Sequence, residues 1–212
     1  MGQLMADIKD TIVKKALRCI DEVLPDPNTL NEAFYPTEAF IDEAVHWVID
    51  VAPAHRLGTG VVWDYVDEMP DITLSEDGVV RIAIPGGANF ARILNIMLPD
   101  WQRPVTSAIN DTDALYKQQQ NRVLRGNPSR PTVALCNSRT ILELYSTRCS
   151  LSEIKSKGRF VVIYYNIEQL PPAVYDLTAW KLAEIVLLSM SDTTAAAICT
   201  ARTNELLQQL VL

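Results

Sequence analysis

The chain has 212 residues, of which 48% are hydrophobic and 21% charged, and its formal net charge is −7. This length suits one domain, or one domain that carries a smaller inserted domain, and it is enough to bury a core without disulfides or metal ions. The N-terminal residues lack the basic start and apolar run of a signal peptide, and no segment is long enough to span a bilayer. We therefore expect no membrane partner.

The four cysteines are far apart, and none belongs to a C-x-x-C pair. The chain also has only two histidines, so the sequence does not predict a zinc site or any other metal site. We expect reduced, mostly buried thiols at Cys19, Cys136, Cys149 and Cys199.

Charge is distributed unevenly along the chain. Residues 1–78 hold 16 acidic and 5 basic side chains, a net charge of −11, whereas residues 79–170 hold 6 and 12, a net charge of +6. Residues 171–212 hold 4 and 2, a net charge of −2. Such asymmetry points to charged partners or to neighbouring subunits.

Apolar residues recur at helical spacing in two N-terminal segments, which predicts helices over 5–24 and 37–52. Pro25 ends the first helix, and Thr37 is suited to cap the second. His46 falls on the polar face of the second helix. This position favours a solvated histidine over a metal ligand or a general base.

From about Asp71 the apolar pattern alternates, as in half-buried strands. Residues 75–78 carry a hairpin turn signal, and residues 107–131 form a long polar segment that we expect to be a functional loop. The predicted strands and strand continuations are 72–74, 79–84, 91–98, 101–105, 132–136, 140–145 and 160–165.

After a pair of prolines, residues 173–190 are apolar around most of a helix circumference, which predicts a central core helix that includes Trp180. Ser191 and Asp192 can cap a last helix over 193–212. The end of that helix either folds back onto the bundle or docks on a partner. Its apolar residues are Leu206, Leu207, Leu210, Val211 and Leu212.

These elements predict an α+β protein, in which a helical bundle formed by both chain ends carries an inserted small antiparallel β domain. We expect the N-terminal helices in 1–70, the β domain with its long loop in 71–168, and the core and docking helices in 169–212.

Catalytic motifs are not found in the sequence: G-x-S-x-G, H-E-x-x-H, Walker A and the dinucleotide fingerprint are all missing. We therefore expect no catalytic residue and no enzyme, although carboxylates distant in sequence can still act together in a hydrolase. Basic residues in the β region could contact phosphates, but aromatic residues for base stacking do not interleave with them. They are Arg122, Arg125, Arg130, Arg139 and Arg148.

The order of these elements resembles the head-to-tail connector proteins of short-tailed phages, the tail tubular protein A or adaptor family. The resemblance covers most of 36–210, and 54–69 match poorly. The stretch Leu115–Asn121 followed by Arg125–Pro128 is similar to the ring proteins of crAss-like phages. The other matching stretches are Asp77-Gly78 with 79–84, Pro85, Phe90-Ala91-Arg92, Trp101–Val105, Ile141–Tyr145, and Leu170-Pro171-Pro172 with Trp180–Ala183.

The resemblance implies a structural virion protein of the phage tail or neck, made in the host cytoplasm. Such a protein forms a dodecameric adaptor ring beneath the portal, extends the DNA channel and attaches the tail. Its partners are further copies of the chain, the portal protein and other tail or ring proteins, and DNA passes without sequence-specific binding. No cofactor is implied. The alternatives are a cytosolic α+β enzyme or regulatory subunit, and a basic-patch nucleic-acid binder.

For a connector we expect two sets of partner-binding residues. Arg122 and Arg125 belong to the basic β insertion, which could meet the acidic N-terminal region of a neighbouring subunit head to tail, or could face DNA. The second set is the apolar C-terminal end, formed by Leu206, Leu207, Leu210, Val211 and Leu212.

Overall fold

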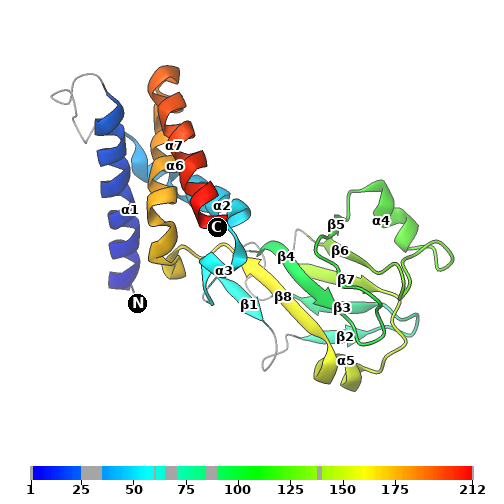
Figure 1. Cartoon of the computed structure of the whole chain (residues 1–212). Coiled ribbons are helices and arrows are strands. Elements are labelled where there is room, and N and C mark those ends of the chain that lie inside the picture. The colour runs from blue at the N-terminus through cyan, green and yellow to red at the C-terminus, as the bar shows by residue number, and fades with distance from the viewer. Residues whose placement is uncertain are drawn as a thin grey trace. The chain divides into compact units, whose positions relative to one another are not determined.

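The computed structural model describes residues 2–24, 35–59, 61–64, 71–84, 90–137 and 140–211. The chain divides into two compact units. The bundle unit comprises Met1–Val61 and Tyr165–Leu212, and the β unit comprises Val62–Tyr164. Helices therefore form from both chain ends and a small, mainly antiparallel β domain is inserted between them (Figure 1). The predicted α+β fold class is confirmed.

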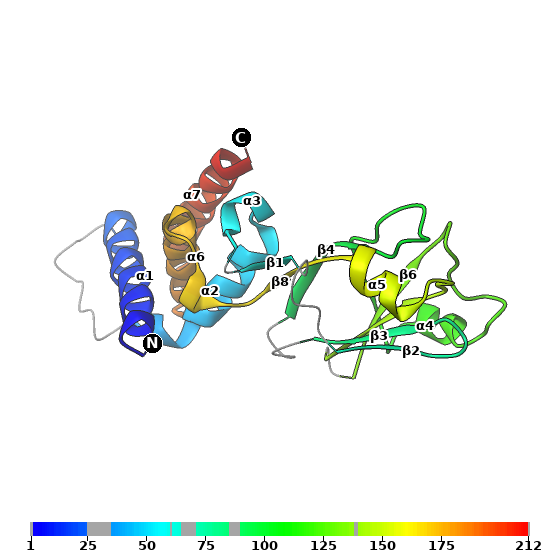
Figure 2. The ribbon, with the colours of Figure 1, turned by 90° about the horizontal axis from the view of Figure 1, so that it is seen from below.

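In the bundle unit, α6 packs against α1, α2 and α7. Figures 1 and 2 show α6 lying between α1 and α7. The predicted central core helix is thus confirmed. The helices are α1 (Gly2–Val23), α2 (Thr37–Val51), α3 (Ala54–Leu57), α6 (Tyr175–Ser189) and α7 (Thr193–Val211), with 3-10 turns η4 (Ile167–Gln169) and η5 (Pro172–Val174).

Local sequence explains where the last two helices begin. Pro172 opens the turn that leads into α6, where its missing N–H costs no hydrogen bond. The Asp192 carboxylate accepts a hydrogen bond from the Ala195 N–H at 3.0 Å and so caps α7, as predicted. One expectation for α6 was wrong: Trp180 is only half-buried, whereas Leu177 and Leu182 are buried in the core.

Charged side chains also join α2 to α6. Glu184 is buried, and its carboxylate accepts a hydrogen bond from Lys181 Nζ at 2.8 Å. The same ammonium group lies 4.7 Å from the ring centroid of Trp47. His46 is exposed, as predicted, and its ring stacks on Tyr165 at 4.0 Å between centroids.

The described residues of the β unit form two sheets, with strand orders β1-β8-β4 and β2-β3-β7-β6-β5. Neighbouring strands are antiparallel except β5 and β6, which are parallel. The main apolar core of this unit draws on both sheets and on α5. The strands are β1 (Val62–Asp64), β2 (Ile72–Leu74), β3 (Val80–Ala83), β4 (Phe90–Met97), β5 (Ile109–Asn110), β6 (Thr132–Cys136), β7 (Ile141–Tyr145) and β8 (Arg159–Tyr164); the helices are α4 (Ala114–Gln119) and α5 (Leu151–Lys157).

Three features of this unit differ from the sequence-based expectation. Strand β1 was not predicted, and because Val62 pairs with Ile163 the unit runs over 62–164 instead of 71–168. Residues 101–105 do not form a strand, although Val105 makes an isolated bridge to Ile96. The polar segment 107–131 is a folded structure that includes β5 and α4.

The predicted hairpin between β2 and β3 is confirmed, and its turn requires a glycine. Gly78 has a φ of +78°, and a Cβ at this position would lie 2.6 Å from the Thr147 carbonyl oxygen. The turn is therefore held tightly against the end of β7.

Candidate partner-binding surfaces

Residues 107–131, which we call the arm, contain β5, α4 and an exposed turn. The arm is held by strand pairing, by a backbone bond to a neighbouring loop and by bonds within itself. Strand β5 pairs with β6, and the backbone N–H of Gln102, just before the arm, donates to the Pro128 carbonyl at 2.9 Å. The backbone N–H of Gly126 donates to Gln119 Oε1 at 2.7 Å. These bonds give a polar, irregular segment a defined conformation.

The carboxylate of Glu143, which is only 6% exposed, is one anchor of α4. Tyr145 donates its phenolic hydrogen to this carboxylate at 2.6 Å, Arg81 Nε donates at 2.8 Å, and Tyr116 from α4 donates at 3.1 Å. A buried carboxylate with three charge-assisted donors is well satisfied. Glu143 therefore ties α4 to the sheet.

Electrostatics support this structural role for Glu143. Burial alone would raise the pKa of Glu143, but the hydrogen bonds from Tyr145, Arg81 and Tyr116 outweigh it and hold the pKa below its usual range. Burial, followed by the nearby carboxylate, raises the pKa of the Tyr145 phenol. A general acid or base that works near neutral pH needs its pKa moved toward 7, roughly, and the pKa of Glu143 moves away from it.

Arg125, one of the predicted binding residues, is directed into the fold, and its side chain is only 8% exposed. Its Nη1 donates to the Asp77 carboxylate at 2.9 Å and to the Asp77 carbonyl at 3.1 Å, and its guanidinium lies 5.8 Å from the ring centroid of Tyr145. A hydrogen bond from Ser75 and then the bond from Arg125 hold the pKa of Asp77 below its usual range. Arg125 thus fixes the arm to the hairpin turn.

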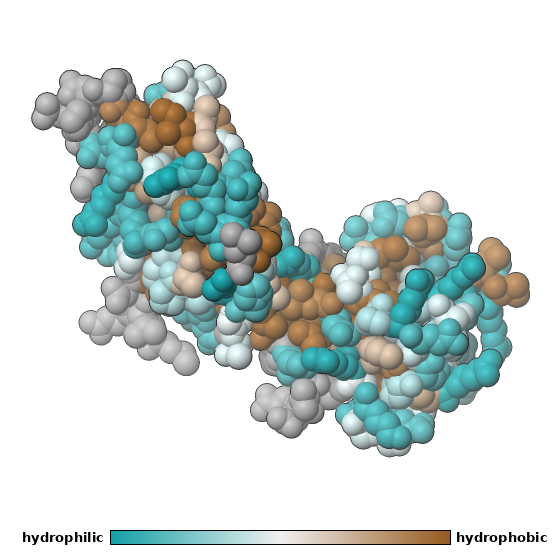
Figure 3. Space-filling model, viewed as in Figure 1, coloured by the Kyte–Doolittle hydropathy of each residue, from teal (hydrophilic) through white to brown (hydrophobic). Residues whose placement is uncertain are grey.

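Arg122, the other predicted binding residue of the arm, is exposed and lies beside two aliphatic residues that sequence reasoning missed. Val123 is 88% exposed and Leu124 is 62% exposed. We call Arg122, Val123 and Leu124 the tip. Figure 3 shows apolar surface at the outer end of the loop that follows α4. An adjacent aliphatic pair inside a polar segment was the signal that could have identified the tip.

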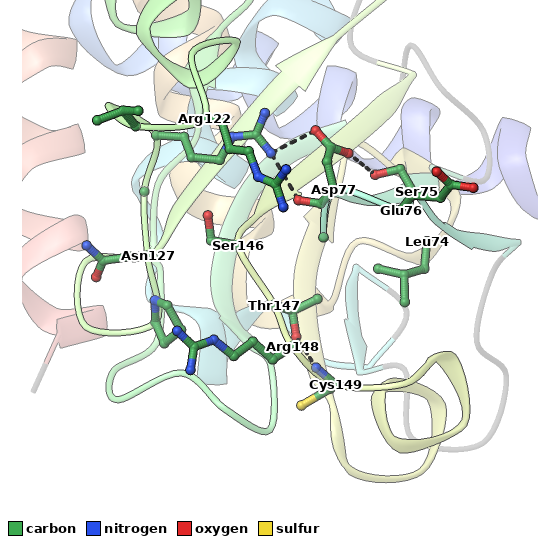
Figure 4. A pocket seen from close by; sticks show the side chains of 15 residues that line it. Leu74, Ser75, Glu76, Asp77, Arg122, Asn127, Ser146, Thr147, Arg148 and Cys149 are labelled. Atoms are coloured by element: carbon green, nitrogen blue, oxygen red, sulfur yellow. Dashed lines mark hydrogen bonds and ion pairs between the residues drawn. The ribbon is translucent and has the colours of Figure 1, made fainter.

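A cleft of about 510 Å³ lies beside the tip. Its lining includes Arg122 and Arg148 as well as Glu76 and Asp77. In Figure 4 Arg122 lies near Asp77, whereas Arg148 lies beside Thr147 and Cys149. Both signs of charge therefore surround this cleft. Arg130 is exposed at a separate turn of the arm, and Arg139 lies outside the described residues.

The apolar end of α7 is only partly covered. Leu206, Leu207 and Leu210 are half-buried, Val211 is 64% exposed, and Leu212 lies outside the described residues. Arg56 Nε donates to the Leu210 carbonyl at 3.1 Å, so the end of α7 is attached to the bundle unit. The end of α7 therefore folds back onto the bundle in part, and its docking on a partner stays a prediction.

The charge asymmetry along the chain is different when charges are counted for each structural unit. The bundle unit holds 15 acidic and 7 basic residues, a net charge of −8, and the β unit holds 11 and 12, a net charge of +1. The acidic residues between Asp64 and Asp77 belong to the β unit, so the expected contrast between an acidic N-terminal region and a basic insertion is weaker. The bundle unit remains strongly acidic.

Among the residues that the structure describes, no group of three or more His, Cys, Asp or Glu side chains could hold a metal ion. Over the same ranges, no helix is both long and apolar enough to cross a membrane. In comparisons with known proteins, no family model, no curated protein and no solved structure matches the chain.

Proposed function

We propose that the chain is a structural subunit of a ring that connects the head and tail of a phage. The observation that carries this proposal is that one chain exposes aliphatic side chains on both of its units. The β unit exposes Val123 and Leu124 at the tip, and the bundle unit exposes Leu188, Ile198 and Val211. Val123 and Leu124 are adjacent, and adjacent exposed aliphatic side chains are a common feature of protein interfaces.

Two different surfaces on one chain are what a ring requires. In a head-to-tail contact one surface of each subunit meets the other surface of the next, and the contacts close if the rotation between subunits divides a full circle. The acidic bundle unit and the arginines of the arm offer opposite charges for such a contact. Complementary charge guides the encounter and fixes its register.

In this proposal the end of α7 makes a further contact. The end of α7, with Leu206, Leu207, Leu210 and Val211, binds the portal or a neighbouring subunit as a helix laid in an apolar groove. DNA passes through the channel without sequence-specific contacts, and the ring belongs to the neck or tail of the virion. The protein contributes shape and attachment, and no catalysis.

Negative-stain electron microscopy and mass photometry of the purified full-length chain test the proposal. We expect closed rings with a central hole, and a mass that is an integral multiple of the subunit mass. If charge joins the subunits, rings without DNA should loosen at about 1 M salt, where screening acts over about 3 Å. A chain that stays monomeric at its highest soluble concentration would contradict the proposed function.

The same measurements separate a neighbour-facing arm from a DNA-facing arm. Arg122→Glu should weaken the rings if the arm faces a neighbour, and should weaken only DNA binding if it faces DNA. Arg125 is unsuitable for this test because its side chain pairs with Asp77 inside the fold.

A further inference from the structure

We propose that the tip of one subunit inserts into a groove on the bundle unit of the next copy of the chain. This inference rests on the proposed function, because it names the contact that would close the ring. It assigns Arg122, Val123 and Leu124 to one side of the contact and the groove between α1 and the start of α2 to the other.

The groove has a volume of about 470 Å³. Its apolar walls come from Val13 and Leu17 of α1 and from Tyr35 and Pro36, which precede α2. Val13, Leu17 and Tyr35 are half-buried and Pro36 is exposed, so apolar surface remains open to a second chain. Covering it with two aliphatic side chains removes apolar area from water on both sides of the contact.

Opposite charges on the tip and on the groove favour a contact between these two surfaces. Glu38 lies in the first turn of α2, at the rim of the groove, and is exposed. Asp10 and Lys14, also on the rim, lie 3.9 Å apart and offset each other. In the part of the chain that the structure describes, neither Glu38 nor Arg122 has an ion-pair partner. The groove therefore offers one uncompensated negative charge and the tip one uncompensated positive charge.

The fold also prepares the tip for binding. The pair of Arg125 with Asp77 and the bond from Gly126 to Gln119 hold the turn on its C-terminal side. The Leu124 N–H donates to the Asn121 carbonyl at 3.0 Å within the turn. A loop that is already ordered loses little conformational entropy when it binds. An apolar groove can cover Val123 and Leu124, whereas a phosphate backbone cannot, which favours a protein partner.

Two complementary charge reversals test the contact. We expect Arg122→Glu alone, or Glu38→Arg alone, to place like charges at every contact and to weaken self-association by at least about tenfold. An equimolar mixture of the two variants should assemble again, because alternating subunits bring opposite charges together at every contact. Mass photometry and electron microscopy of each variant and of the mixture give the readout.

The control is Arg130→Glu, which reverses an exposed arginine of the arm outside the tip and should leave assembly unchanged. Circular dichroism checks that each variant is folded, and Val123→Asp provides an independent disruption of the tip. If the wild type forms rings and Arg122→Glu or Val123→Asp forms them equally well, this inference is wrong and the proposed function stands. The inference is also wrong if each charge-reversal variant assembles poorly alone and the equimolar mixture of the two does not recover assembly. A wild type that never associates overturns both.

Discussion

Arg125 donates two hydrogen bonds to Asp77 across 48 positions of sequence, one to its carboxylate at 2.9 Å and one to its carbonyl at 3.1 Å. Only three positions earlier, Arg122 is exposed and lies on the edge of the neighbouring cleft. The two arginines therefore have different roles, since Arg125 holds the arm in place and Arg122 remains accessible to a partner.

Alanine substitutions should separate these two roles. Arg125→Ala removes charge-assisted bonds and should lower the free energy of unfolding by about 1.5–3 kcal/mol. Arg122→Ala should change it by less than about 0.5 kcal/mol, because the substitution is on the surface. Urea unfolding of both variants measures the difference. Equal effects would show that the Arg125 bonds contribute little to stability.

Because of Glu143, the free energy of unfolding should decrease as the pH is lowered into the acidic range. The pKa of Glu143 is lower in the folded chain than in the unfolded chain. The ionised carboxylate therefore adds to the free energy of unfolding above about pH 4.3, and this stabilisation is lost as the pH falls through the folded pKa. Glu143→Gln should therefore destabilise the protein near neutral pH, and its difference from the wild type should shrink as pH falls. Urea unfolding across a pH series measures this difference.

Glu76→Gln is the matched control for that experiment. Glu76 is exposed at the hairpin turn and lies outside the Glu143 hydrogen-bond network. We expect Glu76→Gln to have only a small effect on the free energy of unfolding. Its difference from the wild type should not shrink as the pH falls, unlike that of Glu143→Gln. A constant difference between wild type and Glu143→Gln at all pH values would show that the carboxylate is not the stabilising form.

Substitutions in α6 should lower the free energy of unfolding more when the replaced side chain is more deeply buried. Leu182 is fully buried, and Leu182→Ala should cost about 2–5 kcal/mol of unfolding free energy. Trp180 is half-buried, so Trp180→Ala should cost less than the 3–5 kcal/mol or so expected for a fully buried tryptophan. Thermal or urea unfolding gives both values. A larger loss for Trp180→Ala than for Leu182→Ala would reverse our assignment of the core.

Removal of residues 206–212 should leave a folded monomer that no longer attaches to its partner. The buried residues of α7 all precede the deletion, since they are Ala195, Ala196, Cys199 and Thr203. Circular dichroism should show an intact fold, and electron microscopy should show lost assembly or lost binding to the portal. Normal assembly of the truncated chain would exclude the end of α7 from the interface.

The cysteines should differ in reactivity toward a chromogenic disulfide reagent. Burial, the largest cause in each case, raises the pKa of Cys19 and Cys199 to about 12 and of Cys136 to about 11. Cys149 is only half-buried, so it should react first in the native protein. Cys149→Ser should remove the fast phase. A fast phase that survives this substitution would indicate that a buried thiol becomes exposed.

The long helices and most strands could be predicted because their apolar periodicity extends over enough residues. The turn before α6 and the cap of α7 followed from Pro172 and Asp192. Strands β1 and β5 were missed because they have three and two residues, too few to show a period. Strand β2 is as short as β1 but was predicted because a hairpin turn signal follows it. Their pairing with β8 and β6 depends on long-range contacts, which a local pattern does not contain.

The candidate surfaces were only partly predictable for a similar reason. Arg122 and Arg125 look alike in the sequence, and only the long-range contact with Asp77 distinguishes them. Val123 and Leu124 could have been noticed, because two adjacent aliphatic residues interrupt a polar segment.

The pairing of β1 with β8 brings the first and last strands of the β unit side by side. Val62 is the register partner of Ile163, and Cα atoms in such antiparallel pairs are about 4.5–5.5 Å apart. Two cuts at this point and a short peptide bridge would remove the whole β unit while the two parts of the bundle stay covalently joined. By the same route, recombination could graft a different β unit onto an unchanged bundle, so that binding specificity evolves separately from the scaffold.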